Sequence, residues 1–182
     1  MKISSLQLIS ELQNITLNNI KFAEIALQIT DNELNYRLSE NGWSILECLE
    51  HLNRYGNFYL PEIENKISAS NRSSVQYFSS GIIGNYFVQM MLPKEKLNKM
   101  KTFTKMNPIH SQLNRGVVKE FISQQNLFLN LLEKAKKVDL NKTKTNISIS
   151  KLIKLRLGDT FRFVIYHNLR HIEQAKKVMN SI

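Results

Sequence analysis

The residues of this sequence whose type and spacing best suggest chemistry are its histidines. There are four of them, and His167 and His171 lie four residues apart in the run Tyr166-His167-Asn168-Leu169-Arg170-His171. On a helix, this spacing puts both imidazoles on one face, one turn apart and close enough to share a metal ion. The same spacing is common on solvated helix faces, so spacing alone leaves a metal site and a surface pair both open.

The other two histidines occur in different contexts. His51 lies between Glu50 and Leu52 in an otherwise apolar region, so its imidazole is expected to point into or beside the core. A lone interior histidine is often only a hydrogen-bonded core residue, and His51 by itself does not indicate a metal. His110 follows Pro108 in a loop and is expected at the surface.

These histidines are positioned by helices, which the spacing of apolar residues predicts. Ser44 followed by Glu47 forms a capping box at the start of the second helix, and Asp159 is a suitable N-cap for the last one. Pro61 predicts a kink or break near Leu60. The four predicted main helices cover residues 4–29, 44–67, 117–137 and 158–180.

The segments between these helices are polar. Residues 31–42 and 139–149 are predicted to be connectors. Residues 68–116 form a longer excursion with a short helix at 81–92 and a run of five lysines at 94–105, and long excursions often carry function. We therefore expect an all-α four-helix bundle in a single domain, residues 1–182, with a long irregular insertion between the second and third main helices.

Composition narrows the class of protein further. The only cysteine is Cys48, so no intramolecular disulfide can form, and no signal peptide or membrane span is visible, which predicts a cytoplasmic protein without a membrane partner. Lys and Arg total 25 against 15 Asp and Glu, a formal charge of +10 that favours anionic partners. The lysines are dispersed and no nucleic-acid-binding motif is present, which argues against nucleic acid.

Two longer motifs connect the histidines with a known family. The run Trp43-Ser44-Ile45-Leu46-Glu47-Cys48-Leu49-Glu50-His51-Leu52 resembles the WSxxExLxHL signature of the DinB-like (YfiT-like) superfamily. The run Leu157-Gly158-Asp159-Thr160, followed by residues 167–174, resembles its closing LGD…HxxRHxxQ segment. The two motifs fall near the start of the second helix and in the last helix, as in that family.

This resemblance implies a bundle whose second and fourth helices supply three histidines, His51, His167 and His171, to one divalent metal ion, zinc or nickel. The family is similar to thiol-dependent transferases that use bacillithiol or mycothiol, and it is also associated with metal-dependent hydrolases. It therefore implies a small-molecule substrate, possibly a low-molecular-weight thiol, and a homodimer. A non-enzymatic role in nucleic-acid binding or stress response is the alternative from a different class.

Three more residues are candidates for the surroundings of this site. Glu47 and Arg170 lie near the histidines in sequence, where Arg170 could clamp an anionic substrate or pair with a carboxylate. Glu47 also has its role in the capping box, which we weight more heavily than catalysis. Tyr55, one turn after His51, could line a pocket, although packing is the commoner role of such an aromatic residue.

Overall fold

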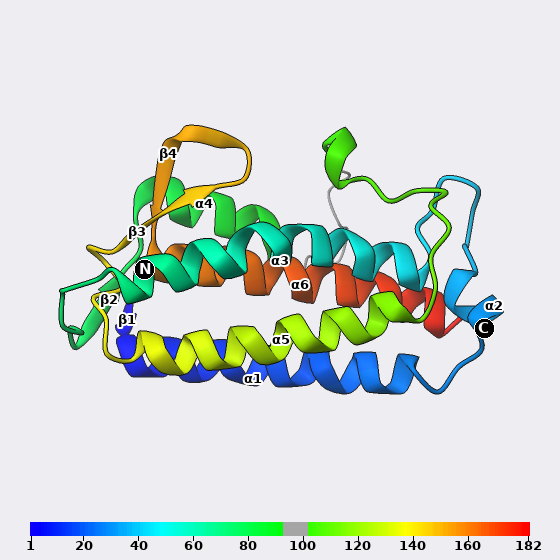
Figure 1. Cartoon of the computed structure of the whole chain (residues 1–182), viewed down its shortest axis with the longest axis horizontal. Coiled ribbons are helices and arrows are strands. Elements are labelled where there is room, and N and C mark those ends of the chain that lie inside the picture. Colours follow the sequence, from blue (N-terminus) through cyan, green and yellow to red (C-terminus); the bar gives the residue numbers. More distant parts are fainter. Residues whose placement is uncertain (93–101) are drawn as a thin grey trace.

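Four long helices pack side by side along most of the length of the molecule (Figure 1) in a computed structural model that describes residues 1–92 and 102–182. Helix α1 contacts α5 and α6, and α3 contacts the same two helices, so the four form a closed ring around a common core. The predicted all-α four-helix bundle is confirmed. The four helices are α1 (Ser5–Ala26), α3 (Ile45–Ser68), α5 (Gly116–Ala135) and α6 (Leu157–Met179).

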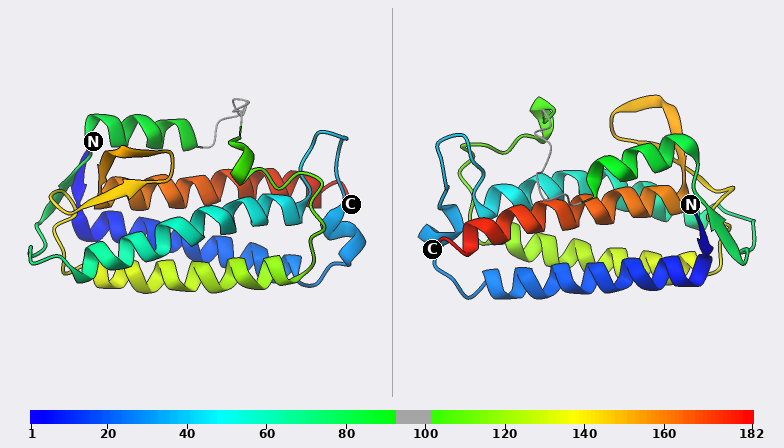
Figure 2. Two further views of the ribbon diagram at one scale, coloured as in Figure 1. Left: turned by 45° about the horizontal axis from the view of Figure 1, so that its top comes forward. Right: turned by 180° about the vertical axis from the view of Figure 1, so that it is seen from behind.

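The direction of these helices determines where the long insertion runs. Helices α1 and α6 point one way, and α3 and α5 point the other way (Figures 1 and 2). Because α3 and α5 are parallel, residues 69–115 must bring the chain back along the bundle. This insertion contains β2 (Tyr77–Ser79), α4 (Ile82–Met91), which packs on α6, and the short 3-10 helix η1 (Thr104–Met106), which packs on α3. Residues 94–101, which belong to the run of five lysines at 94–105, lie outside the residues that the structure describes.

Two small antiparallel sheets lie outside the ring. Strand β1 (Lys2–Ser4) pairs with β2, and β3 (Lys144–Ile147) pairs with β4 (Ser150–Arg156) as a hairpin. The prediction that residues 139–149 form only a connector is therefore wrong. Burial alternates along β3, with Thr145 and Ile147 buried, which is the pattern of a half-buried strand.

The second main helix begins as predicted but ends differently. The Ser44 Oγ accepts a hydrogen bond from the Glu47 amide at 3.2 Å, and the Glu47 carboxylate accepts one from the Ser44 amide at 2.8 Å, which completes the capping box. A break near Leu60 is not found, because α3 continues through Pro61 to Ser68. Leu60 and Ile63 are buried on either side of the proline and hold both halves of the helix in one line against the core.

The predicted N-cap of the last helix is wrong. Strand β4 leads directly into α6, so the helix begins at Leu157 and Arg156 occupies the N-cap position without a side-chain cap. Asp159 lies in the first turn, and its carboxylate accepts hydrogen bonds from the Ser80 hydroxyl and, at 2.8 Å, from the Gly81 amide. Asp159 thus binds the backbone at the start of α4 rather than that of its own helix.

The core of the bundle consists of two apolar clusters. Leu12, Phe128 and Phe161 belong to one cluster, whereas Leu46 and Phe121 belong to the other. Along α3 and α6, the two clusters meet at the level of the buried histidines. Within the two described ranges, no helix is both long enough and apolar enough to cross a membrane.

Candidate metal centre

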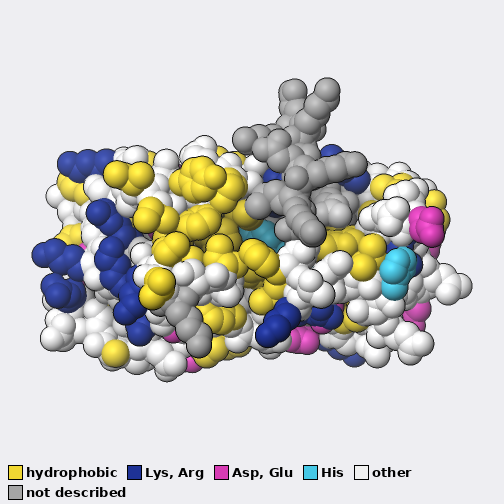
Figure 3. All heavy atoms as spheres, turned by 90° about the horizontal axis from the view of Figure 1, so that it is seen from above, with side chains coloured by type: hydrophobic (Ala, Val, Ile, Leu, Met, Phe, Trp, Pro, Cys, Tyr) yellow, Lys and Arg dark blue, Asp and Glu magenta, His cyan; other side chains and the backbone are white. Residues whose placement is uncertain are grey.

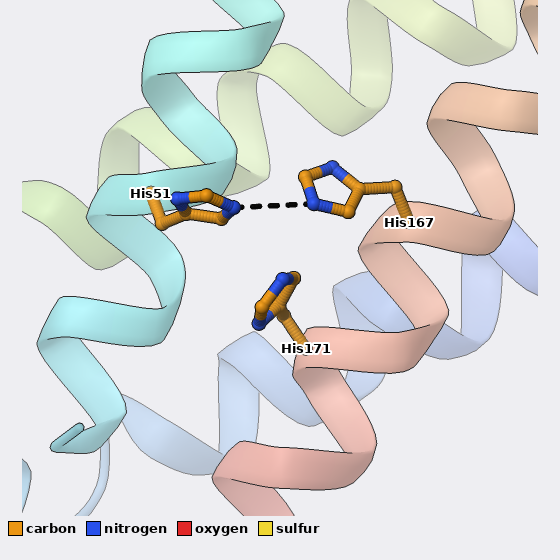
Figure 4. A group of neighbouring side chains, drawn as sticks. All are labelled: His51, His167 and His171. Atoms are coloured by element: carbon orange, nitrogen blue, oxygen red, sulfur yellow. Dashed lines mark hydrogen bonds between the residues drawn. The ribbon is translucent and has the colours of Figure 1, made fainter. Parts of the chain in front are cut away.

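The structure brings together the three histidines that the sequence motifs single out. His51 projects from the second turn of α3, and His167 and His171 project from α6 toward it (Figure 4). The Nε2 atoms of His51 and His167 are 3.1 Å apart, as the dashed line in Figure 4 marks. One ring nitrogen of each of the three residues lies within 4.8 Å of the other two, so the group could hold a metal ion.

The outer ring nitrogens fix the orientation of two of these imidazoles. The His51 Nδ1–H donates to the Met106 carbonyl at 2.7 Å, and the His171 Nδ1–H donates to the Gln174 Oε1 at 3.0 Å. Both partners are oxygen acceptors, so the proton of each neutral ring is on Nδ1. The lone pairs on Nε2 of His51 and His171 are therefore free for another partner.

Burial keeps the three imidazoles neutral. His51 and His167 are 3% and 5% exposed, and burial lowers the pKa of His51 to about 4. Burial, followed by the charges of the neighbouring groups, lowers the pKa of His167 well below its ordinary value, and burial does the same for His171. Neutral imidazole is the form that binds a metal, because the ion needs the lone pair that a proton would occupy.

The nitrogen atoms of the cluster are not fully paired within the protein. The buried Nδ1 of His167 has no hydrogen-bond partner in the parts of the chain that the structure describes. If both facing Nε2 atoms of His51 and His167 were unprotonated, their lone pairs would repel each other at 3.1 Å. A buried acceptor without a donor costs about 1–3 kcal/mol, and a shared cation removes that cost for the nitrogens that bind it.

Aromatic rings surround the three imidazoles. Trp43 stacks on His171, with ring centroids 5.5 Å apart and planes inclined by 24°. Phe163, one turn before His167 on α6, stacks on it at 6.0 Å and 11°. Tyr55 lies edge-on to His167, at 4.7 Å between centroids. These rings hold the imidazoles in place and exclude water from their faces.

Glu47 lies next to this site in sequence but serves another purpose. Its carboxylate accepts hydrogen bonds from Arg37 at 2.7 and 2.9 Å, from the Ser44 amide and, at 2.6 Å, from the His110 amide. Burial raises the pKa of Glu47, but these donors outweigh burial and the net shift is downward. A carboxylate held by four donors fastens the loops around the start of α3 and is a poor proton acceptor.

The remaining candidates are placed differently. Arg170 precedes His171 on α6, is 7% exposed, and burial lowers the pKa of its guanidinium. His110 is exposed, as predicted, and has a positive φ of 61°. It is not part of the three-histidine group.

Fold and site together define a class of protein: a four-helix bundle with a cluster of three histidines, one from the second main helix and two from the last, of which His51 and His167 are buried and His171 is half-buried. The model of the DinB superfamily matches residues 20–175, so this chain belongs to the DinB superfamily. No match was found among curated proteins or among solved structures.

Two features of the site were not predicted from the sequence. Gln174 lies three residues after His171, and this helical spacing is a signal that could have identified it as the partner of His171. The Met106 carbonyl belongs to the insertion, 55 residues from His51, and no local pattern indicates that contact.

Proposed function

We propose that His51, His167 and His171 bind one divalent metal ion, zinc or nickel, and that the protein is a metal-dependent enzyme. The observation that carries this proposal is the convergence of three neutral imidazoles, two of which have their Nδ1 protons committed outward to Met106 and Gln174. A cluster of acceptor nitrogens arranged in this way can share one cation.

The spacing of the nitrogens supports this assignment. Ligand atoms around a tetrahedral zinc ion, with Zn–N bonds of about 2.0–2.1 Å, lie roughly 3.3 Å apart. The Nε2 atoms of His51 and His167 are 3.1 Å apart, which fits such an ion, and the ligand nitrogens of all three residues lie within 4.8 Å of one another. A structural zinc site normally has four protein ligands, and the described part of the chain contributes only these three histidines to the group.

The reaction that we favour is the transfer of a low-molecular-weight thiol to an electrophilic small molecule, and metal-dependent hydrolysis is the alternative. A divalent ion with three protein ligands keeps an open position, where it can lower the pKa of water or a thiol and so supply a nucleophile at neutral pH. In both reactions the residues of the chain orient the site. The Met106 carbonyl and Gln174 hold two rings by their Nδ1 protons, and Trp43 packs against His171.

The first experiment measures the metal content of the purified, untagged protein by elemental mass spectrometry. We expect about one zinc or nickel ion per chain in the wild type, as a three-histidine site requires, and none in the His51→Ala variant. His110→Ala is the matched control and should keep the ion, since His110 is exposed and outside the group. The absence of metal in the wild type, with none taken up from added zinc or nickel, would contradict the proposal.

The reaction class is tested next, with the metal-loaded protein. Turnover of an electrophilic acceptor that requires an added thiol supports thiol transfer, whereas turnover without any thiol supports hydrolysis. The predicted homodimer is tested on the same preparation by light scattering coupled to size-exclusion chromatography. A monomeric mass would contradict that prediction without affecting the metal site.

A further inference from the structure

An open cleft lies beside the three histidines, between α4, the β3–β4 hairpin and the face formed by α3 and α6. Phe87 and Met90 line it from α4, and Ile149 lines it from the turn of the hairpin. Seen from above in Figure 3, apolar side chains gather on this face of the molecule, and a histidine surface is visible at the edge of that apolar area.

Two aromatic rings connect the cleft with the candidate metal centre. Tyr55 and Phe163 both line the cleft. The ring of Tyr55 lies 5.0 Å from that of His51 and 4.7 Å from that of His167, between centroids, and Phe163 stacks on His167. A molecule in the cleft is therefore separated from the histidines by the width of one side chain.

The cleft has no charge of its own. Among the described residues that line it, none is acidic or basic, although the chain carries a net charge of +10. The Tyr59 hydroxyl lies 3.4 Å from the Ser148 hydroxyl and accepts from the Ser148 amide at 3.3 Å, so these polar groups pair with each other. Lys105 lines only the adjoining hollow toward η1. A charged group entering the cleft would lose water without gaining a partner.

One polar side chain of the cleft remains for a ligand. Tyr55 lines the cleft, and no hydrogen bond of its hydroxyl is present in the described ranges. As a phenol, this group can donate to a carbonyl or ether oxygen. A mostly apolar lining with one or two oriented polar groups is typical of small-molecule sites.

We propose that this cleft binds the uncharged, apolar body of a small molecule, an aromatic ring or a branched aliphatic group, and so holds that molecule one aromatic side chain away from the three histidines. The assignment of this ligand as the substrate rests on the proposed function. Binding of the ligand in the cleft does not rest on that function, since the described lining contains none of the three histidines.

The test uses the neutral fluorescent dye N-phenyl-1-naphthylamine, titrated into the full-length protein. We expect saturable binding of one dye per chain, because the dye is uncharged and apolar. Phe87→Glu and Ile149→Glu place a carboxylate on opposite walls of the cleft, and each should weaken binding at least about 10-fold, since the charge must lose water when the dye binds. The titrations are run on metal-loaded protein and on protein treated with a chelator.

Each wall offers a matched control on the same element. Tyr86→Glu is the control on α4, and Leu152→Glu is the control on the hairpin, because these side chains are 62% and 94% exposed and do not line the cleft. Both controls should bind the dye like the wild type. Equal weakening in the controls would place the dye on the exposed apolar surface and overturn the proposal, as would unchanged binding in both cleft variants.

Two further outcomes separate this proposal from the proposed function. If the protein cannot hold metal but still binds the dye, the cleft proposal is supported and the metal site is contradicted. If the protein holds metal but binds no dye, only the cleft proposal is contradicted. If circular dichroism shows that Phe87→Glu does not fold, Ile149→Glu carries the test, because Ile149 is 48% exposed in a turn. Equally tight binding of the anionic dye 1-anilinonaphthalene-8-sulfonate would contradict the requirement for an uncharged ligand.

Discussion

Helix α6 buries polar side chains at two levels, and the two groups differ in how their atoms are matched. At its first turn, Asp159 and Arg162 form an ion pair at 3.3 Å, with side chains 1% and 4% exposed. Ser80 and Gly81, which precede α4, also donate to the Asp159 carboxylate. We call these four residues the Asp159 cluster. Two turns later, His167 and His171 meet His51 in the histidine cluster, where the Nε2 atoms of His51 and His167 face each other at 3.1 Å and no opposite charge among the described residues is paired with them.

The two clusters differ in whether their buried polar groups find partners within the chain, and this difference suggests a different role for each. In the Asp159 cluster, a buried charge finds its opposite charge and its donors within the chain, and the effect is to fasten α4 onto α6. In the histidine cluster, the outer nitrogens of two rings are satisfied and the inner ones are left as acceptors. Pairing of opposite charges within the chain indicates a structural role, although the Arg162 Nε has no partner among the described residues. Acceptor nitrogens gathered at one point form a group that could hold a cation.

Close packing around the Asp159 cluster also explains part of the LGD motif. A Cβ on Gly84 would lie 2.3 Å from the Asp159 Oδ2, and a Cβ on Gly158 would lie 2.5 Å from the ring of Phe78. Glycine at these two positions lets α4 and β2 approach α6 this closely. These two residues of the motif therefore hold the insertion against the bundle.

Acid should destabilise the histidine cluster most strongly when no metal is bound. The pKa of His51 is about 4 in the folded protein and about 6.5 when unfolded, so between pH 6.5 and 4.5 the unfolded chain gains most of a proton and the folded chain gains little. Stability then falls as the pH falls, by about 2 kcal/mol for His51 alone over these two pH units, and His167 and His171 add to this loss. Urea denaturation of chelator-treated protein at three pH values measures the slope.

The same titration with zinc present provides the control. Bound metal excludes protons from the rings and stabilises the folded state, so the curve should lie higher at pH 6.5 and fall more steeply as acid displaces the ion. Glu47, whose pKa is lowered, loses its contribution only at a pH below its ordinary value and does not interfere in this window. A flat profile in the metal-free protein would show that the histidines are not buried as neutral groups.

Asp159→Ala should destabilise the fold while leaving the metal in place. The substitution leaves the Arg162 guanidinium buried without its carboxylate, and breaking a buried ion pair in this way costs about 3–5 kcal/mol. Glu133→Ala is the matched control, since Glu133 pairs with Lys136 at the same i,i+3 spacing on the surface, where a pair is worth about 0–1 kcal/mol. Urea denaturation and metal content are measured for both, and similar losses in the two variants would mean that the Asp159 cluster does not fasten the insertion.

Gln174→Leu should weaken metal binding without unfolding the protein. It removes the acceptor that orients His171, and the loss of such a partner typically costs 10- to 100-fold in affinity, about 1.4–2.7 kcal/mol. Competition with a chromogenic chelator measures the affinity. Gln89→Leu, at an exposed position of α4, is the control and should bind like the wild type. Unchanged affinity in Gln174→Leu would show that His171 does not depend on this hydrogen bond.

A feature can be predicted from the sequence when residues close together in the chain determine it. The capping box at Ser44, the four helices and the two histidine motifs are local patterns, and the structure shows all of them. The short helix α2 (Asp31–Asn35) differs from the connector predicted there, although Thr30 and Glu33 form the same kind of capping box. Hairpin β3–β4 also differs from the connector predicted there, because its threonines and lysines give that segment the composition of a polar linker.

Other features could not be predicted because distant segments create them. Asp159 was expected to cap its own helix, and only the position of α4 shows that it binds Ser80 and Gly81 instead. The contact between His51 and the Met106 carbonyl depends in the same way on the path of the insertion across the bundle. Local rules describe each helix well, but they give no information about which loop lies above which side chain.

The parallel arrangement of α3 and α5 has a consequence for how such proteins can diversify. A helix of 24 residues extends about 36 Å at 1.5 Å per residue, so the segment that joins α3 to α5 has to travel that distance outside the core. Elements of that return path, α4 and η1, lie against the face where the three histidines meet. Mutations in the return path can therefore reshape what enters the site, while the helices that carry the histidines stay unchanged.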